Sequence, residues 1–98
     1  MPKYLVTWEV DPARVSTDPK ERGAMWSMMV DMVKQDLQEN REEDWGCFVG
    51  ETSGYSISER SEIDIAKDLQ RFFPFVSFKV RQVMTVDEMA EVMQSLTE

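Results

Sequence analysis

The chain contains no histidine, and this absence removes several kinds of chemistry. Catalytic pairs of serine or cysteine with histidine, histidine-ligated zinc or haem, and the usual proton shuttle at neutral pH all require an imidazole. The single cysteine, Cys47, allows no disulfide within the chain and no Cys-x-x-Cys pair, so nothing requires an oxidising compartment. We therefore expect a cytoplasmic protein without a metal or cofactor, and we assign no catalytic residue.

Positive charge is also scarce. The 98 residues include 11 Lys and Arg against 19 Asp and Glu, which gives a formal net charge of −8. Binding of nucleic acid requires a clustered positive surface, so this acidic composition argues against such a partner. The chain has no apolar run of the roughly 20 residues that span a membrane, and it begins without the apolar segment of a signal peptide. We expect no nucleic-acid and no membrane partner.

The composition is that of one folded domain, residues 1–98, with 42% hydrophobic and 31% charged residues. Four segments rich in β-branched and aromatic residues are predicted strands: 3–10, 45–49, 55–58 and 75–84. In the first strand Tyr4, Val6, Trp8 and Val10 share one face, since side chains alternate along a strand.

Helix start signals precede three further segments. Asp18 and Pro19 open a long helix that frays near Asn40. Ser61 opens a short helix that ends before Pro74, and Thr85 begins a capping box for a last helix. The short helix is predicted to turn four residues inward: Ile63, Ala66, Leu69 and Phe73.

The resulting order is β-α-β-β-α-β with one helix added at the C-terminus. This order predicts an α+β fold of the ferredoxin-like kind, a four-stranded antiparallel sheet with two helices on one face. The other face then needs a cover, either a second subunit or the C-terminal helix. The apolar arc of the long helix, which includes Met25, Met28, Met29 and Met32, spans about 200° and is wider than one packed face requires.

Three segments resemble a known group of proteins: Lys3–Trp8, Gly46–Glu51, and Phe75–Val83 with the helix after it. They are similar to a family of small bacterial and archaeal domains of uncharacterised function within the dimeric α+β barrel superfamily. The resemblance implies a homodimer that pairs through its sheets. Enzymes of that superfamily hold small aromatic or polyketide-like substrates between sheet and helices, but their recurrent histidines have no counterpart here.

Polar residues of the predicted strands form the candidate ligand site. We expect them on one sheet face, with Glu9 near Lys79 and Thr7 near Arg81, where the two cations would hold a small anionic molecule. A solvated or dimer-facing surface with routine ion pairs is the alternative interpretation. The set consists of Thr7, Glu9, Ser56, Ser58, Ser77, Lys79 and Arg81.

Three functions remain open from the sequence. The first is a homodimer that binds a small molecule. The second is a histidine-independent isomerase or monooxygenase-like enzyme in which Glu9 or Arg81 assists, and the third is a protein-interaction module that uses the Met-rich helix. The acidic run of Glu39, Glu42, Glu43 and Asp44 is interpreted as a solvated turn.

The anion-site hypothesis predicts the behaviour of a double variant, Lys79→Ala with Arg81→Ala. Folding should survive, because exposed ion pairs contribute only about 0–1 kcal/mol. Thermal shifts caused by anions such as phosphate or benzoate should disappear. A variant that unfolds would make the two cations structural, and a wild-type chain that no anion stabilises would remove the support for the site.

Overall fold

The computed structural model describes residues 2–98, which form one antiparallel sheet and three α-helices. In chain order the elements are β1 (Lys3–Val10), α1 (Pro19–Gln38), β2 (Asp44–Cys47), β3 (Ser53–Ser58), α2 (Glu62–Leu69), β4 (Val76–Val83) and α3 (Val86–Ser95). The predicted α+β class with a four-stranded antiparallel sheet is confirmed.

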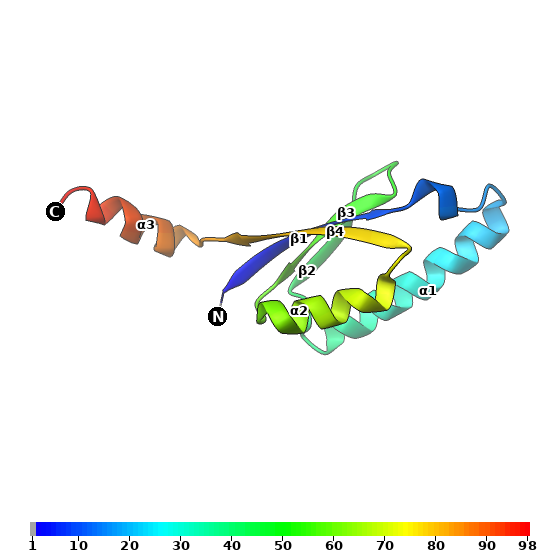
Figure 1. Cartoon of the computed structure of the whole chain (residues 1–98), viewed down its shortest axis with the longest axis horizontal. Coiled ribbons are helices and arrows are strands. Elements are labelled where there is room, and N and C mark those ends of the chain that lie inside the picture. The colour runs from blue at the N-terminus through cyan, green and yellow to red at the C-terminus, as the bar shows by residue number, and fades with distance from the viewer. Residues whose placement is uncertain (1) are drawn as a thin grey trace.

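The strand order is β2-β3-β1-β4, and α1 and α2 cover the same face of the sheet (Figure 1). We call this face the inner face and the opposite one the outer face.

The predicted helix starts are confirmed by their caps. The Asp18 carboxylate accepts a hydrogen bond from the Lys20 N–H at 3.2 Å, and the Ser61 hydroxyl accepts one from Asp64 at 3.2 Å. At α3, the Thr85 hydroxyl accepts from the Glu88 N–H at 3.2 Å while the Glu88 carboxylate accepts from the Thr85 N–H at 2.9 Å. These bonds satisfy backbone donors that have no partner inside the helix.

The inner face of β1 forms the core, as its alternation predicted. Tyr4, Val6, Trp8 and Val10 are all buried. Gly54 lies opposite Trp8 on β3, and a Cβ there would come within 2.5 Å of the indole ring and 2.0 Å of the Gly46 carbonyl oxygen. Glycine at this position therefore lets the indole lie against the sheet.

The register of β1 and β4 differs from the predicted pairing by two residues. The strands are neighbours, but Thr7 lies opposite Lys79, and Glu9 lies opposite Ser77. Inner-face packing sets this register, because it places Val10 opposite Val76 and Trp8 opposite Phe78 in the core. Within residues 2–98 no ion pair joins Glu9 to Lys79.

The side chains of β3 are placed differently from the predicted set. Ser56 and Ser58 lie opposite Val6 and Tyr4 and are buried on the inner face, each 4% exposed. Tyr55 and Ile57 consequently occupy the outer face. The expectation that all seven polar residues share one face is therefore wrong for these two serines.

The inward side of α2 also differs from the prediction. Ile65 is buried, whereas Ile63 is 66% exposed and Phe73 is 45% exposed. The helix begins at Glu62 and gives way at Gln70 to a short 3₁₀ turn, so Ile65 and Leu69, one turn apart, face the sheet.

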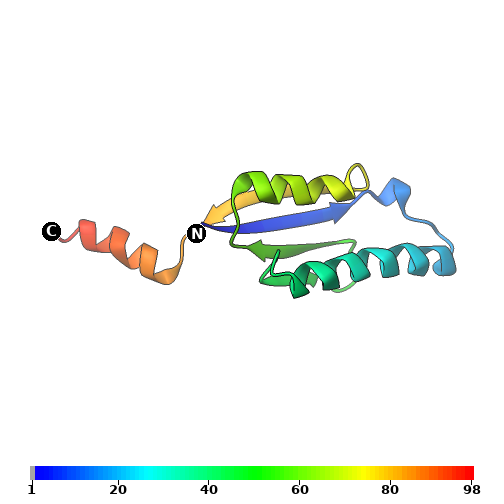
Figure 2. The ribbon, with the colours of Figure 1, turned by 90° about the horizontal axis from the view of Figure 1, so that it is seen from below.

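The C-terminal helix does not cover the outer face. α3 continues beyond the end of β4 and lies outside the two-layer body (Figures 1 and 2). Every residue from Met84 to Glu98 is exposed, and the molecule measures 61 Å along its longest axis. The chain's own α3, one of the two covers considered, therefore does not lie over the outer face.

One ion pair connects the two helical segments above the sheet. Asp36 of α1 is 2% exposed and accepts two hydrogen bonds from the Arg71 guanidinium, at 3.1 and 2.7 Å. The Arg71 Nε–H donates to the carbonyl oxygen of Asp68, which fixes the side chain at the end of α2. A bidentate geometry of this kind is the strongest form of such a pair.

Removing the Asp36 carboxylate should therefore destabilise the fold. We expect Asp36→Ala to lower the free energy of unfolding by about 1–3 kcal/mol, because the two charge-assisted hydrogen bonds that join α1 to the end of α2 are lost while the partly exposed Arg71 is rehydrated. Asp31→Ala, at an exposed position of the same helix, should change it by no more than about 0.5 kcal/mol. Urea denaturation measures both, and equal effects of the two substitutions would contradict this role of the pair.

Candidate functional site

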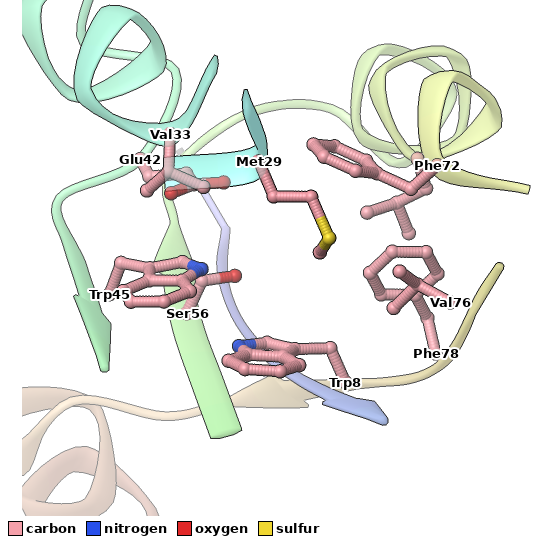
Figure 3. A pocket seen from close by; sticks show the side chains of 10 residues that line it. Trp8, Met29, Val33, Glu42, Trp45, Ser56, Phe72, Val76 and Phe78 are labelled. Atoms are coloured by element: carbon pink, nitrogen blue, oxygen red, sulfur yellow. The ribbon is translucent and has the colours of Figure 1, made fainter. Parts of the chain in front are cut away.

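A cleft opens on the inner face, between α1 and α2 and above the sheet (Figure 3). It measures about 380 Å³ with its open mouth included, while the space in which a water molecule fits is about 30 Å³. Its walls are mainly apolar, with one carboxylate and one hydroxyl among them. The lining residues are Trp8, Met29, Val33, Glu42, Trp45, Ser56, Leu69, Phe72, Val76 and Phe78.

Aromatic rings form the floor and one wall of this cleft. Trp8 on β1 and Trp45 on β2 stack with their ring centroids 5.2 Å apart and 11° between planes. The Trp8 Nε1–H donates to the Tyr55 carbonyl oxygen at 3.3 Å, which holds the indole in place. On the other side of the cleft, Phe72 and Phe78 meet edge to face with their ring centroids 6.2 Å apart (Figure 3). Such surfaces suit a flat, apolar ligand.

Glu42 supplies the carboxylate of the cleft. Its backbone is held by neighbouring bonds: the Arg41 N–H donates to the Asp36 carbonyl oxygen at 2.9 Å, and the Glu43 N–H donates to that of Ile57 at 2.8 Å. The side chain is directed into the cleft beside Ser56 and Trp45 (Figure 3). The interpretation of this acidic run as a solvated turn is therefore wrong for Glu42.

One oxygen of this carboxylate is not satisfied by the protein. Within residues 2–98, Glu42 Oε2 is the one buried side-chain polar atom without a hydrogen-bond partner. Native structures contain few such atoms, because each carries the desolvation penalty of an unpaired polar group. An unpaired oxygen in a cleft therefore points to a ligand or solvent partner.

Burial gives the Glu42 carboxyl an unusual acidity. It raises the pKa from 4.5 to about 7. The negative charge of Asp36 adds to the rise, the positive charge of Arg71 opposes it, and the negative charge of Asp68 adds further. Nearby cations have other partners: Arg71 binds Asp36, and Arg41 and Arg60 both pair with Asp68. Glu42 is thus a carboxyl that changes protonation near neutral pH.

The seven residues predicted from the sequence fall into two groups. Ser56 lines the inner cleft, and the Ser58 hydroxyl donates to the Arg41 carbonyl oxygen at 3.1 Å. The other five lie on the outer face. A groove there brings Thr7, Glu9, Ser77 and Lys79 together, and its space of about 220 Å³ compares with about 30 Å³ in the inner cleft by the same measure. Arg81 follows on the same side of β4, opposite Leu5. Neither Lys79 nor Arg81 has an ion-pair partner within 4.0 Å in the described part of the chain.

The sequence held a signal for Asp36 but none for Glu42. Asp36 follows Met29 and Val33 at helical spacing, so a charged residue stands on the apolar stripe of α1. A buried carboxylate of this kind requires a cationic partner. Glu42 stands in a run of charged residues, and its burial depends on how α1 and β2 meet in space.

No protein-family model matches the chain, and no curated protein is significantly similar to it. The described residues include no helix with the length and apolarity to cross a membrane. They also include no group of three His, Cys, Asp or Glu side chains placed to hold a metal ion. The predicted cytoplasmic location, ligand and dimer stay predictions.

The raised pKa of Glu42 predicts how stability depends on pH. The folded protein holds this proton up to about pH 7, while the unfolded chain releases it near pH 4.5. The free energy of unfolding should therefore decrease as the pH rises from about 4.5 to 7, because the folded state binds more protons in this window.

Substitution isolates this contribution. Glu42→Gln should remove this decrease and raise the free energy of unfolding at pH 8 by about 1 kcal/mol relative to the native chain. Asp31→Asn, at an exposed position of α1, is the matched control and should leave the dependence of the unfolding free energy on pH unchanged. Urea denaturation between pH 4.5 and 8.5 measures the profiles, and identical curves for the native chain and Glu42→Gln would refute the assignment.

Proposed function

We propose that this chain binds a small uncharged aromatic molecule in the inner cleft, with Glu42 making the directional hydrogen bond. The observation that carries this proposal is the unpaired Glu42 oxygen within walls of stacked aromatic rings. Pockets of this composition, apolar with a few convergent polar groups and a perturbed pKa, are typical of ligand sites.

The protonation state of Glu42 selects the chemistry of the ligand. Below about pH 7 the carboxyl is protonated and donates a hydrogen bond, which suits a carbonyl oxygen. Ser56 provides a second polar group on the sheet side. An anion suits this cleft poorly, since Glu42 itself becomes negative above pH 7 and Asp36 and Asp68 lie nearby. The anionic ligand expected from the sequence stays a prediction for the outer face.

The size of the cleft requires it to open before a ligand can enter. Its space of about 30 Å³ is about a tenth of the lower end of the about 300–1,000 Å³ typical of small-molecule sites. The space of about 30 Å³ that water can occupy holds only one or two waters, so a ring enters when a lining side chain moves. Met29 is the flexible member of the lining and is suited to that movement.

We also propose that the sheet and helices have the ferredoxin-like arrangement and that the chain is related to the dimeric α+β barrel superfamily. We further propose that it forms a homodimer and lies in the cytoplasm. The element order β-α-β-β-α-β and the common layer of α1 and α2 support the arrangement. In the superfamily that the sequence resembles, enzymes hold substrates between sheet and helices, and the inner cleft lies in the corresponding place.

Proton transfer is the second candidate function, and the pKa of Glu42 favours it. A general acid or base works best when its pKa lies near the operating pH, and a carboxyl with a pKa of about 7 meets this condition without histidine. A ligand carbonyl bonded to Glu42 would be placed to receive or lose a proton, as an isomerase requires.

Binding of acetophenone compared with benzoate tests the proposed function. Trp8 and Trp45 line the cleft, so a ligand there should change tryptophan fluorescence. Acetophenone has a carbonyl acceptor and no donor, so we expect it to bind several-fold more tightly at pH 6, where the Glu42 carboxyl is protonated, than at pH 8. Benzoate should bind more weakly than acetophenone at pH 8, where both it and Glu42 are negative.

Two variants locate the binding site. Glu42→Gln should bind acetophenone equally at both pH values, since its amide donates throughout, and Lys79→Ala with Arg81→Ala should bind as the native chain does. Acetophenone binding that is independent of pH in the native chain would contradict the role of Glu42. A preference for benzoate that is lost with Lys79 and Arg81 would instead place the ligand site on the outer face.

A further inference from the structure

α3 carries an apolar stripe that nothing in its own chain covers. Met89, Val92, Met93 and Leu96 repeat at intervals of three and four residues, and their exposed fractions lie between 42% and 74%. The helix stands clear of the body in both views (Figures 1 and 2). We call residues 84–98 the C-terminal arm.

The length of α3 argues that the arm has a partner. The helix has 10 residues, and isolated helices shorter than about 12–15 residues are marginal in water. Such helices form stably when an apolar face packs against another surface. The stripe on α3 provides that face, so the helix implies a surface on which it packs.

The chain's own outer face is poorly placed to be that surface. Only Met84 and Thr85 connect β4 to α3, and Thr85 is extended, with φ −73° and ψ 169°. Its reciprocal capping bonds with Glu88 fix the direction in which the helix leaves the strand. Folding back would require this cap to rearrange, whereas a second copy can approach without disturbing it.

The outer face has the complementary composition. Four apolar side chains, Leu5, Tyr55, Ile57 and Val83, are only half-buried there, because no layer lies over them. Lys79 and Arg81 stand beside them on β4, without an ion-pair partner within 4.0 Å in the described residues. This face is an apolar strip with two available cations on β4. It also carries two carboxylates, Glu9 in the groove beside Lys79 and Asp44, which accepts a hydrogen bond from the Tyr55 hydroxyl.

Charge favours the arm as the occupant of this face. The arm contains four acidic residues, Asp87, Glu88, Glu91 and Glu98, and no Lys or Arg. Opposite charges on two surfaces guide their association and disfavour other partners. The Met-rich groove beside α1 offers no comparable match, since its one cation, Arg71, already binds Asp36.

We propose that the α3 stripe of one chain packs on the outer face of a second copy, and that the second copy returns the contact. This inference rests on the proposed homodimer. It places the partner's α3 on the outer face instead of the direct contact between sheets that the resemblance implies. Each chain has one arm and one outer face, so a two-fold axis satisfies both contacts and closes the assembly. Two reciprocal contacts also double the buried area, toward the about 1,000 Å² that a specific interface needs.

Cross-linking tests the arm contact directly. In a Cys47→Ser background, Met93→Cys places a thiol on the stripe and Ile57→Cys places one on the outer face. A short bis-maleimide should join these positions into a covalent dimer. The combination of Met93→Cys with Lys34→Cys, on the exposed side of α1, is the matched control and should give no dimer beyond that of Met93→Cys alone.

Light scattering on the unmodified chain, taken with the cross-linking result, separates the homodimer from the exchange of arms. A mass of twice 11.5 kDa with the 93–57 cross-link supports it fully. A dimer that fails to cross-link keeps the homodimer but overturns the arm exchange. A monomer overturns both. A cross-link found within single chains overturns the arm exchange, because the arm then folds back on its own sheet.

Charge variants give an independent test on the folded chain. Lys79→Glu with Arg81→Glu should weaken the dimer at least tenfold at low salt, and the native dimer should weaken as salt is added. Lys34→Glu changes charge on α1 and should have little effect. A dissociation constant that is unchanged by the double reversal would overturn the assignment of the outer face.

Discussion

The bidentate pair between Asp36 and Arg71 is the interaction on which the inner side of the molecule depends. It joins α1 to the segment that follows α2, and the Arg71 bond to the Asp68 carbonyl oxygen extends the connection into α2 itself. The two helices are thereby held at a fixed separation above the sheet. The cleft occupies the space that this separation leaves.

The same pair explains the state of Glu42. Arg71 pairs with Asp36, and Arg41 and Arg60 both pair with Asp68. Each of these cations near the cleft therefore has a carboxylate partner other than Glu42. Glu42 is left with desolvation and the negative charge of Asp36, and its pKa rises to about 7. Histidine is the usual side chain that titrates near neutral pH, and this chain has none. The Glu42 carboxyl supplies such a group instead.

The two faces of the sheet therefore have different roles in this account. The inner face combines aromatic rings with a titrating carboxyl and is suited to a small molecule. The outer face combines Leu5, Ile57 and Val83 with Lys79 and Arg81 and is suited to another copy of the chain. Alternation along β1 and β4 produces this division, because successive residues contribute to opposite faces.

Local signals in the sequence predicted the elements well. Asp18, Ser61 and Thr85 start helices because their side chains bond nearby backbone donors, which requires no knowledge of the rest of the fold. The alternation in β1 predicted its buried face for the same reason. These features depend on a few neighbouring residues.

Features that depend on distant packing were not predictable in this way. Ser56 and Ser58 are polar yet face the core, because β3 must oppose Val6 and Tyr4 in the register that the sheet adopts. Ile65 replaces Ile63 on the inner side of α2 for a similar reason. Glu42 enters the cleft because bonds from Arg41 and Glu43 shape the connection to β2, and its neighbours in sequence give no sign of this.

The carbon-13 NMR titration of the Glu42 carboxyl, assigned by its absence in Glu42→Gln, tests the central claim most directly. We expect a midpoint near pH 7 in the free protein, and a higher midpoint with acetophenone bound, because a ligand that prefers the protonated form stabilises it. A midpoint near the ordinary 4.5, unmoved by acetophenone, would contradict the claim.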